Sequence, residues 1–84
     1  MTTTRTAEDL RATILSVLGD IAPDADTTSL DPEASLRQQL DLDSMDFLNF
    51  VIGLHKRLGV EIPESDYGRL GSLSGALGYL QARP

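Results

Sequence analysis

The sequence contains no cysteine and no tryptophan, and aromatic residues make up only 5% of its 84 positions. Without a thiol, the chain can form neither a disulfide nor a thiolate metal site, and cysteine usage says nothing about its compartment. No apolar run approaches the roughly 20 residues that a transmembrane helix needs. The N-terminal stretch MTTTRTAEDL also has no apolar core of the kind found in signal peptides. These absences predict a cytoplasmic protein that does not insert into membranes.

Basic residues are also scarce in this chain. It has 7 Lys and Arg against 13 Asp and Glu, which gives a formal net charge of −6. This balance argues against nucleic-acid binding, because that binding depends on basic side chains that neutralise phosphates. It argues equally against an anionic membrane surface, and it favours partners with basic patches. The length allows one small domain, which we expect to be monomeric.

The spacing of the apolar residues predicts one small all-α domain over residues 6–84, preceded by a flexible polar tail over residues 1–5. Thr6 is a suitable N-cap, and Asp9 follows three residues later, an arrangement close to a capping box. The helix that these residues introduce is predicted over Ala7–Leu18. Its apolar residues recur at helical spacing, so one face of this helix is expected to enter the core.

A long loop and three more helices are predicted after the first helix. The loop covers Asp20–Gln38, where Asp, Pro, Ser and Thr are frequent, and Gly59 is expected to end the second main helix, which begins at Ser44. A short helix or turn begins at Pro63, and Ser72 is a suitable N-cap for the last helix. The predicted fold is therefore a small four-helix bundle with three main helices and a short third helix. Isolated apolar residues are expected to pin the loop to the core: Ile21, Leu30, Leu36 and Leu40.

The serine at the start of the second main helix has acidic neighbours on both sides. Asp43 is a suitable N-cap for this helix, and Asp46 lies where a carboxylate meets free backbone N–H groups. A catalytic Ser44 would need a nucleophile-elbow sequence and a base within hydrogen-bond reach. The chain's one histidine, His55, lies about 16 Å farther along the helix axis. We therefore predict that the protein is not an enzyme.

The acidic residues do not match a calcium-binding loop. In the twelve-residue window that begins at Asp24, Ser29 occupies the sixth position and Ser35 the twelfth, where such a loop needs Gly and Glu. The window that begins at Asp41 fails at the same two positions. We therefore interpret the acids as solvated side chains and predict no metal site.

A serine fixed at the first position of a helix can instead be an attachment point. A chain without a thiol needs a prosthetic arm to carry an activated acyl group. The stretch LDLDSMDFLNFVIGLHKRLGVEIP, from Leu40 to Pro63, resembles the phosphopantetheine-attachment region of acyl carrier proteins. The resemblance lies in its Asp-Ser-Met core and in the GVEIP sequence that follows the helix. The resemblance extends over most of the chain. It implies that Ser44 bears phosphopantetheine through a phosphodiester, and that Asp43 helps a phosphopantetheinyl transferase to hold its Mg²⁺.

Two features depart from the family pattern. Many members have Gly where this chain has Asp41, which affects the loop backbone or the fit of the transferase. In the family, acids are usual farther along the helix that begins with the serine, and His55, Lys56 and Arg57 replace them here. This basic end suits the helix dipole and also changes the charge that a partner meets. We therefore expect a specialised carrier of a fatty-acyl or lipid pathway, with its own set of partners.

Steps of three and four residues place Met45, Leu48 and Ile52 on one stripe of the helix beside Ser44. Either this apolar strip is a docking surface for partners, or it packs beneath the long loop. The residues predicted to recognise partners are Asp41, Asp43, Met45, Asp46, Leu48, Ile52, Lys56 and Arg57. The resemblance implies a further set of residues that lines a cavity for the acyl chain: Leu40, Phe50, Val51, Leu54, Ile62, Leu70, Ala76 and Tyr79.

The resulting hypothesis is a freestanding acyl carrier protein. It would hold an acyl thioester on phosphopantetheine at Ser44 and present it to synthases, transferases or acyl ligases. Two alternatives stay open: an aminoacyl or peptidyl carrier that serves an adenylating ligase, and an acidic helical interaction module without a prosthetic group. The cargo separates the first alternative from the hypothesis, and loading by a transferase separates the second.

Overall fold

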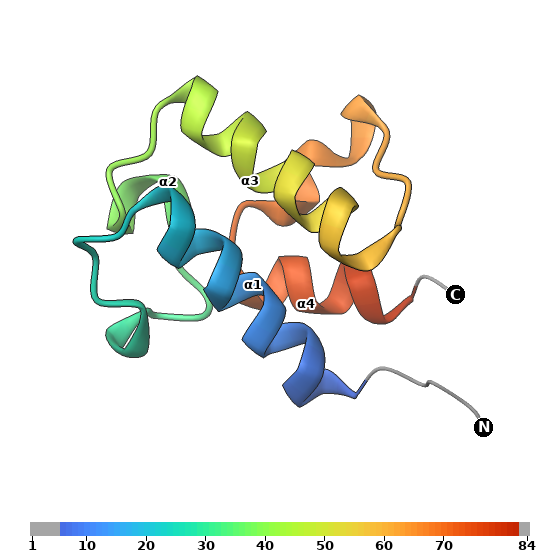
Figure 1. Ribbon diagram of the computed structural model, residues 1–84, viewed down its shortest axis with the longest axis horizontal. Helices are drawn as coiled ribbons and strands as arrows, with labels where there is room; N and C mark the ends of the chain where they lie inside the picture. Colours follow the sequence, from blue (N-terminus) through green and yellow to red (C-terminus); the bar gives the residue numbers. More distant parts are fainter. Residues whose placement is uncertain (1–5, 83–84) are drawn as a thin grey trace.

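A computed structural model describes residues 6–82 of the chain, whose helices enclose one apolar core (Figure 1). Residues 6–82 contain no β-strand, so the predicted all-α bundle is confirmed. No helix in this range is both long enough and apolar enough for a membrane crossing. The tail predicted over residues 1–5 lies outside the described part. The elements follow in the order α1 (Ala7–Ile21), η1 (Thr27–Ser29), α2 (Leu36–Gln39), α3 (Ser44–Leu58), η2 (Glu64–Leu70) and α4 (Leu73–Gln81), where η marks a 3₁₀ helix.

Local capping interactions set several helix ends as the sequence predicts. The Thr6 hydroxyl accepts a hydrogen bond from the Asp9 N–H at 3.1 Å, and the Asp9 carboxylate accepts one from the Thr6 N–H. Ser72 begins α4 by accepting a hydrogen bond from the Gly75 N–H at 3.0 Å. Gly59 ends α3 with a φ of 66°, in the left-handed region that glycine enters without a steric penalty.

The predicted end of the first helix is wrong. α1 continues beyond Leu18 as far as Ile21. Gly19 does not adopt a left-handed conformation, and the Ala22 N–H still donates to the Leu18 carbonyl at 2.8 Å. The glycine near the helix end is therefore not the residue that stops it, because a stop of this kind requires a positive φ.

The segment Asp20–Gln38 is also not one continuous loop, since it contains η1 and most of α2. Asp26 caps η1, and its pKa lies below its usual range chiefly because the Thr28 hydroxyl donates to the carboxylate. Ser35 begins α2 by accepting a hydrogen bond from the Gln38 N–H at 3.3 Å. A helix of four residues is too short to show an apolar period, which explains why the pattern of the sequence did not indicate it.

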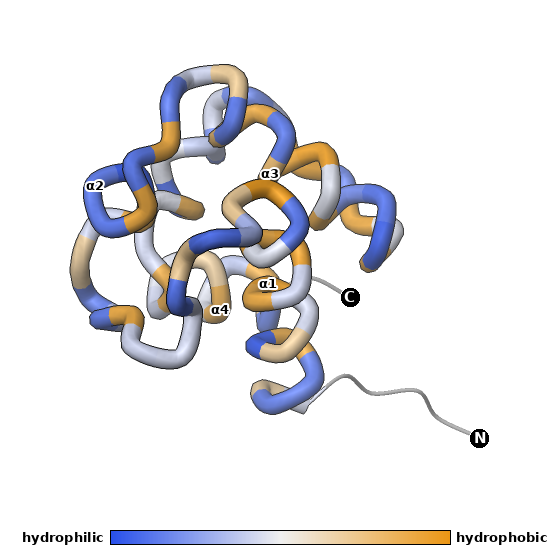
Figure 2. Tube along the Cα trace, turned by 60° about the vertical axis from the view of Figure 1, so that its left-hand side comes forward, coloured by the Kyte–Doolittle hydropathy of each residue, from blue (hydrophilic) through white to orange (hydrophobic). Residues whose placement is uncertain are grey.

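α1 packs against both α3 and α4, and Figure 2 shows apolar segments alternating with hydrophilic ones along these helices. α1 and α3 lie close together at Gly53, where an added Cβ would lie 2.7 Å from Val17 Cγ1. A side chain at this position would therefore require the Val17 side chain or one of the two helices to shift. The largest side chains that are fully buried come from all the main elements: Ile14, Leu18, Leu36, Phe50, Leu54, Leu70 and Leu73.

The segment that carries α2 is fastened to the start of α4. The Leu36 N–H donates to the Gly71 carbonyl at 2.8 Å, and the Leu36 side chain is fully buried. The Ser74 N–H donates to the Pro32 carbonyl at 2.9 Å, and the Ser74 hydroxyl donates to the Glu33 carboxylate. These contacts fix α2, and with it the turn that leads into α3. The other predicted anchors also pack against the core and are partly buried: Ile21, Leu30 and Leu40.

Candidate functional site at the start of helix α3

Ser44 is the first residue of α3 and is exposed. The helix start is held by a reciprocal capping box. The Asp46 N–H donates to Asp43 Oδ1 at 2.8 Å, and the Asp43 N–H donates to Asp46 Oδ2 at 3.3 Å. Both predicted capping roles are confirmed. Because the two carboxylates are engaged by backbone N–H groups, they stabilise the helix start and leave the serine hydroxyl accessible.

The three acids around Ser44 do not form a metal site. Across residues 6–82, no group of three or more His, Asp or Glu side chains is arranged to hold a metal ion. Oδ1 of Asp43 is occupied by the capping bond, whereas Oδ2 accepts no hydrogen bond from the described residues. A cation at this carboxylate would therefore need most of its ligands from another molecule.

The turn before α3 explains the departure at Asp41. This residue has a φ of 54°, and within the described part it is the one non-glycine residue with a positive φ. Glycine adopts this conformation most easily, and Asp is among the few other residues that tolerate it. The backbone at this position therefore keeps the shape that a glycine would give, while the side chain adds an exposed carboxylate beside the helix start.

An arginine that the sequence analysis did not identify lies next to Ser44. Arg37 is in α2, and its Nη2 donates to Ser44 Oγ at 3.4 Å while its Nε donates to the Leu42 carbonyl at 3.5 Å. Its guanidinium also lies over the Phe47 ring, 5.8 Å from the ring centroid, within the range of a cation–π contact. The pattern Ser35-x-x-Gln38 was the available signal, because it marks the helix start that places Arg37 here.

The apolar strip Met45, Leu48 and Ile52 is on the surface of α3. The exposed fractions are 65% for Met45, 36% for Leu48 and 39% for Ile52, which contradicts the alternative that the strip packs beneath the loop. The opposite face of α3 is buried, in agreement with the helical spacing of its apolar residues. Its buried residues are Phe50, Val51, Leu54 and Leu58. Exposed apolar side chains in one row beside Ser44 form a surface that a partner can cover.

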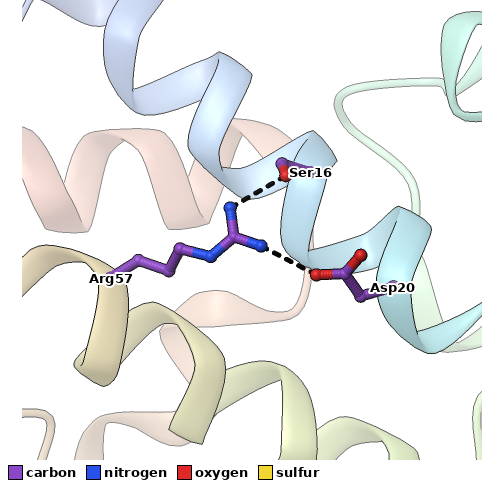
Figure 3. Close-up of polar contacts among 3 residues, drawn as sticks. All are labelled: Ser16, Asp20 and Arg57. Carbon is purple, nitrogen blue, oxygen red and sulfur yellow. Dashed lines mark hydrogen bonds and ion pairs between the residues drawn. The ribbon is translucent and has the colours of Figure 1, made fainter.

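The basic end of α3 is partly occupied by contacts within the chain. Figure 3 shows the Arg57 guanidinium between two side chains of α1. Its Nη1 donates to Ser16 Oγ at 2.8 Å, and its Nη2 lies 2.7 Å from Asp20 Oδ2 in an ion pair. Arg57 therefore ties α3 to α1, a structural role that the sequence did not predict. Its partner-recognition role, like that of exposed Lys56, stays a prediction.

A groove of about 240 Å³ lies between α3 and η2. His55 is at its edge, with Nδ1 at 2.8 Å from the Val60 carbonyl and 3.6 Å from the Glu61 carboxylate. The groove thus combines polar groups at its edge with apolar side chains. Its lining consists of Val51, Ile52, His55, Glu61, Ile62 and Tyr67.

The residues expected to line an acyl cavity lie in different environments. Val51 and Ile62 line the groove beside η2, whereas Leu40 lines a separate hollow of about 470 Å³ near the end of α1. Tyr79 is buried and its hydroxyl donates to Asp66 Oδ2 at 2.7 Å. A shared cavity would require these packed side chains to move apart, and it stays a prediction. The remaining members have no exposed surface: Phe50, Leu54, Leu70 and Ala76.

Comparison with known proteins gives a consistent set of relatives. Residues 8–80 match the family model described as "Phosphopantetheine attachment site". The chain is 30% identical over 73 residues to an acyl carrier protein from Rubrobacter xylanophilus, covering 83% of this chain and 90% of that protein. It is 33% identical over 64 residues to D-alanyl carrier protein 1 from Lactiplantibacillus plantarum, covering 76% of this chain and 78% of that protein.

The fold is also similar to a solved structure. An acyl carrier protein from Enterococcus faecalis superposes with a TM-score of 0.79 and 19% identity, covering 94% of this chain and 99% of that one. At this identity the likeness concerns the fold alone. The residues at the start of α3 fit the group that the family model names, since an accessible hydroxyl at Ser44 lies beside a guanidinium. Phosphopantetheine is therefore the prosthetic group of this chain, which belongs to the acyl carrier protein family.

Proposed function

We propose that the phosphopantetheine is attached to Ser44 and that the chain carries an acyl group on it. The observation that supports this site best is an exposed hydroxyl at the first position of a helix whose start is fixed by the Asp43–Asp46 capping box. When bound, phosphopantetheine supplies the thiol that this cysteine-free chain lacks, and the thiol holds the cargo as a thioester. The chain itself presents the arm and performs no catalysis.

Asp43 has two compatible roles in this proposal. One oxygen of its carboxylate caps α3, and the other is available to a Mg²⁺ that a phosphopantetheinyl transferase brings to the complex. The transferase completes the coordination of the ion, because the described residues of the chain provide no metal-binding group of three ligands. Asp41 is exposed beside it and contributes to the negative charge that a basic partner surface meets.

Partner enzymes dock, in this proposal, on the exposed strip Met45, Leu48 and Ile52. The strip begins beside Ser44 and is bordered by acids, so apolar contact and charge attraction act on one surface. The partners are the transferase that loads the arm and the synthases, transferases or acyl ligases that use the cargo. Lys56 lies exposed at the far end of α3 and is proposed to select among these partners.

The cargo of the arm is proposed to be a fatty-acyl or related lipid group. The acyl carrier relative and the apolar residues around the groove beside η2 support this assignment. An amino acid is the second candidate, because the chain is 33% and 34% identical to two D-alanyl carrier proteins. Mass spectrometry of the protein isolated from its native host separates the two, since a fatty acyl group and an amino acid differ in mass. The match to the phosphopantetheine-attachment family model supports a carrier role over the alternative of an interaction module without a prosthetic group.

The attachment site is tested by loading with coenzyme A, Mg²⁺ and a promiscuous phosphopantetheinyl transferase. The wild type should gain the mass of one phosphopantetheine, and Ser44→Ala should gain none. Ser65→Ala, which changes an exposed serine in η2, is the matched control and should load fully. Folding of Ser44→Ala should be nearly unchanged because Asp43 still caps α3. An unmodified wild type, or a modified Ser44→Ala, would reject the proposed site.

A further inference from the structure

We propose that Arg37 is a positioning residue that binds the phosphodiester of the phosphopantetheine arm. It thereby directs the root of the arm, the part next to the phosphate, over α2. This inference rests on the proposed attachment at Ser44. It concerns a residue of α2, whereas the site described so far belongs to the start of α3. The proposal follows from the contacts of the guanidinium, from its lack of a carboxylate partner, and from the open space beside it.

The contacts of Arg37 place its charge at the attachment oxygen. Nη2 donates to Ser44 Oγ at 3.4 Å, and Oγ becomes the ester oxygen of the phosphodiester when the arm is attached. The phosphate is therefore bonded directly to an atom that the guanidinium already contacts. The guanidinium lies over the Phe47 ring in this place, and its Nε also donates to the Leu42 carbonyl.

The two hydrogen bonds of Arg37 are long and easily exchanged. At 3.4 and 3.5 Å, they exceed the usual range of 2.7–3.2 Å for N–H···O bonds. A guanidinium has five N–H donors in a planar fork, which matches two phosphate oxygens at once. Charged phosphate oxygens at shorter distances would therefore replace weak neutral acceptors. Lysine has no such fork and should reproduce only part of the effect.

Arg37 also lacks the counter-charge that a second arginine has. Arg57 is paired with Asp20 at 2.7 Å, whereas no carboxylate oxygen of residues 6–82 lies within 4.0 Å of the Arg37 guanidinium. Arg11, Lys56 and Arg69 likewise form no ion pair in residues 6–82, so what distinguishes Arg37 is that its guanidinium contacts Ser44 while its charge stays available to an anion there. The phosphodiester carries one negative charge and supplies the missing partner.

The space around Arg37 accommodates the root of the arm. A hollow of about 600 Å³ opens on the α2 side and is lined by Ser35, Arg37, Gln38, Asp41 and Leu42. Its lining is mostly polar, which suits the hydroxyl and amide groups of phosphopantetheine near the phosphate. An arm that starts on this side leaves the apolar strip of α3 open for a partner.

The test is ³¹P NMR of the loaded protein. The experiment compares wild type, Arg37→Gln, Arg37→Lys and the control Arg11→Gln, which removes the same charge from an exposed position of α1. The wild type and Arg11→Gln should show a broad phosphodiester signal that narrows and shifts as salt is added. In Arg37→Gln the signal should already be narrow at low salt and insensitive to salt, and Arg37→Lys should be intermediate.

A second measurement follows the arginine itself. The Nε–H resonance of Arg37 should move when the apo protein is loaded, and amide spectra of the apo variants verify that each is folded. The salt titration and the Arg37→Lys variant keep the test decisive if Arg37→Gln does not fold. If the wild type loads but its ³¹P signal matches Arg37→Gln and the Nε–H resonance stays in place, this inference is wrong. If no phosphodiester signal forms at Ser44, the proposed function fails instead.

Discussion

Replacing Leu48 and Leu54 separately by alanine should separate docking from folding on α3. Leu54 has no exposed surface, and removing a buried leucine side chain costs about 2–5 kcal/mol. A change of 1 kcal/mol moves the melting temperature of a domain of this size by about 4–8 °C, so Leu54→Ala should lower it by roughly 10 °C or more. Leu48 is 36% exposed and lies in the apolar strip. Leu48→Ala should therefore cost about 1 kcal/mol or less.

The kinetic effects of the two substitutions should have the opposite order. If the strip docks partners, Leu48→Ala removes apolar contact area in the complex and should lower kcat/KM for loading by a phosphopantetheinyl transferase about tenfold. Leu54→Ala should load at nearly the wild-type rate at a temperature where it is folded. Asn49→Ala changes an exposed neighbour of Leu48 on the same helix and is the control for nonspecific effects.

The assay combines urea unfolding with initial loading rates for the same four proteins. A Leu48→Ala protein that loses as much stability as Leu54→Ala would mean that Leu48 is a core residue and that no docking strip exists. Unchanged loading and unchanged stability of Leu48→Ala would also refute the reasoning, because the side chain would then contribute to neither process. The predicted outcome is a large stability loss in one variant and a large rate loss in the other.

Three further predictions concern charge and backbone. Arg57→Ala should lose about 0.5–1 kcal/mol in urea unfolding at low salt, and less at high salt, because the exposed pair with Asp20 is screened, whereas Lys56→Ala should change little. Asp41→Val should cost about 1–2 kcal/mol in the same assay because a β-branched residue resists a φ of 54°, whereas Asp41→Gly should stay within about 0.5 kcal/mol of wild type. Added salt should raise the melting temperature of this acidic chain, and Mg²⁺ at equal ionic strength should act similarly, since residues 6–82 hold no clustered metal ligands. A specific gain with Mg²⁺ or an unchanged melting point would contradict this last expectation.

Features that depend on a few neighbouring residues were predictable from the sequence. The Thr6 and Ser72 caps, the Asp43–Asp46 box and the glycine stop at Gly59 all act within four residues of the helix end that they set. The division of α3 into a buried and an exposed face follows from helical period alone. These local rules were sufficient to predict the bundle and to place Ser44 at a helix start.

Features that depend on distant contacts were not predictable in the same way. The hydrogen bond from Arg57 to Ser16 joins residues 41 apart, and no local pattern indicates that α1 and α3 bring them together. Arg37 reaches Ser44 only because α2 turns the chain, and this helix is too short to have a visible period. Its existence depends on the burial of Leu36 and on hydrogen bonds to the start of α4. Tertiary packing therefore decides where the cation lies.

In the proposed arrangement, the charges around Ser44 act on two different molecules, the acids on a docking enzyme and Arg37 on the prosthetic arm. The acids of α3 and the turn before it face the solvent, where they attract a basic partner surface at long range and are screened by salt. Arg37 contacts Ser44 Oγ and lines the hollow on the α2 side, where it would meet an anion that is covalently fixed beside it. An anionic arm among carboxylates alone would be repelled from the protein surface in every direction. The Arg37 guanidinium on the α2 side would attract the phosphodiester. The arm would then begin toward α2 and leave α3 free to bind the enzyme that acts on the cargo.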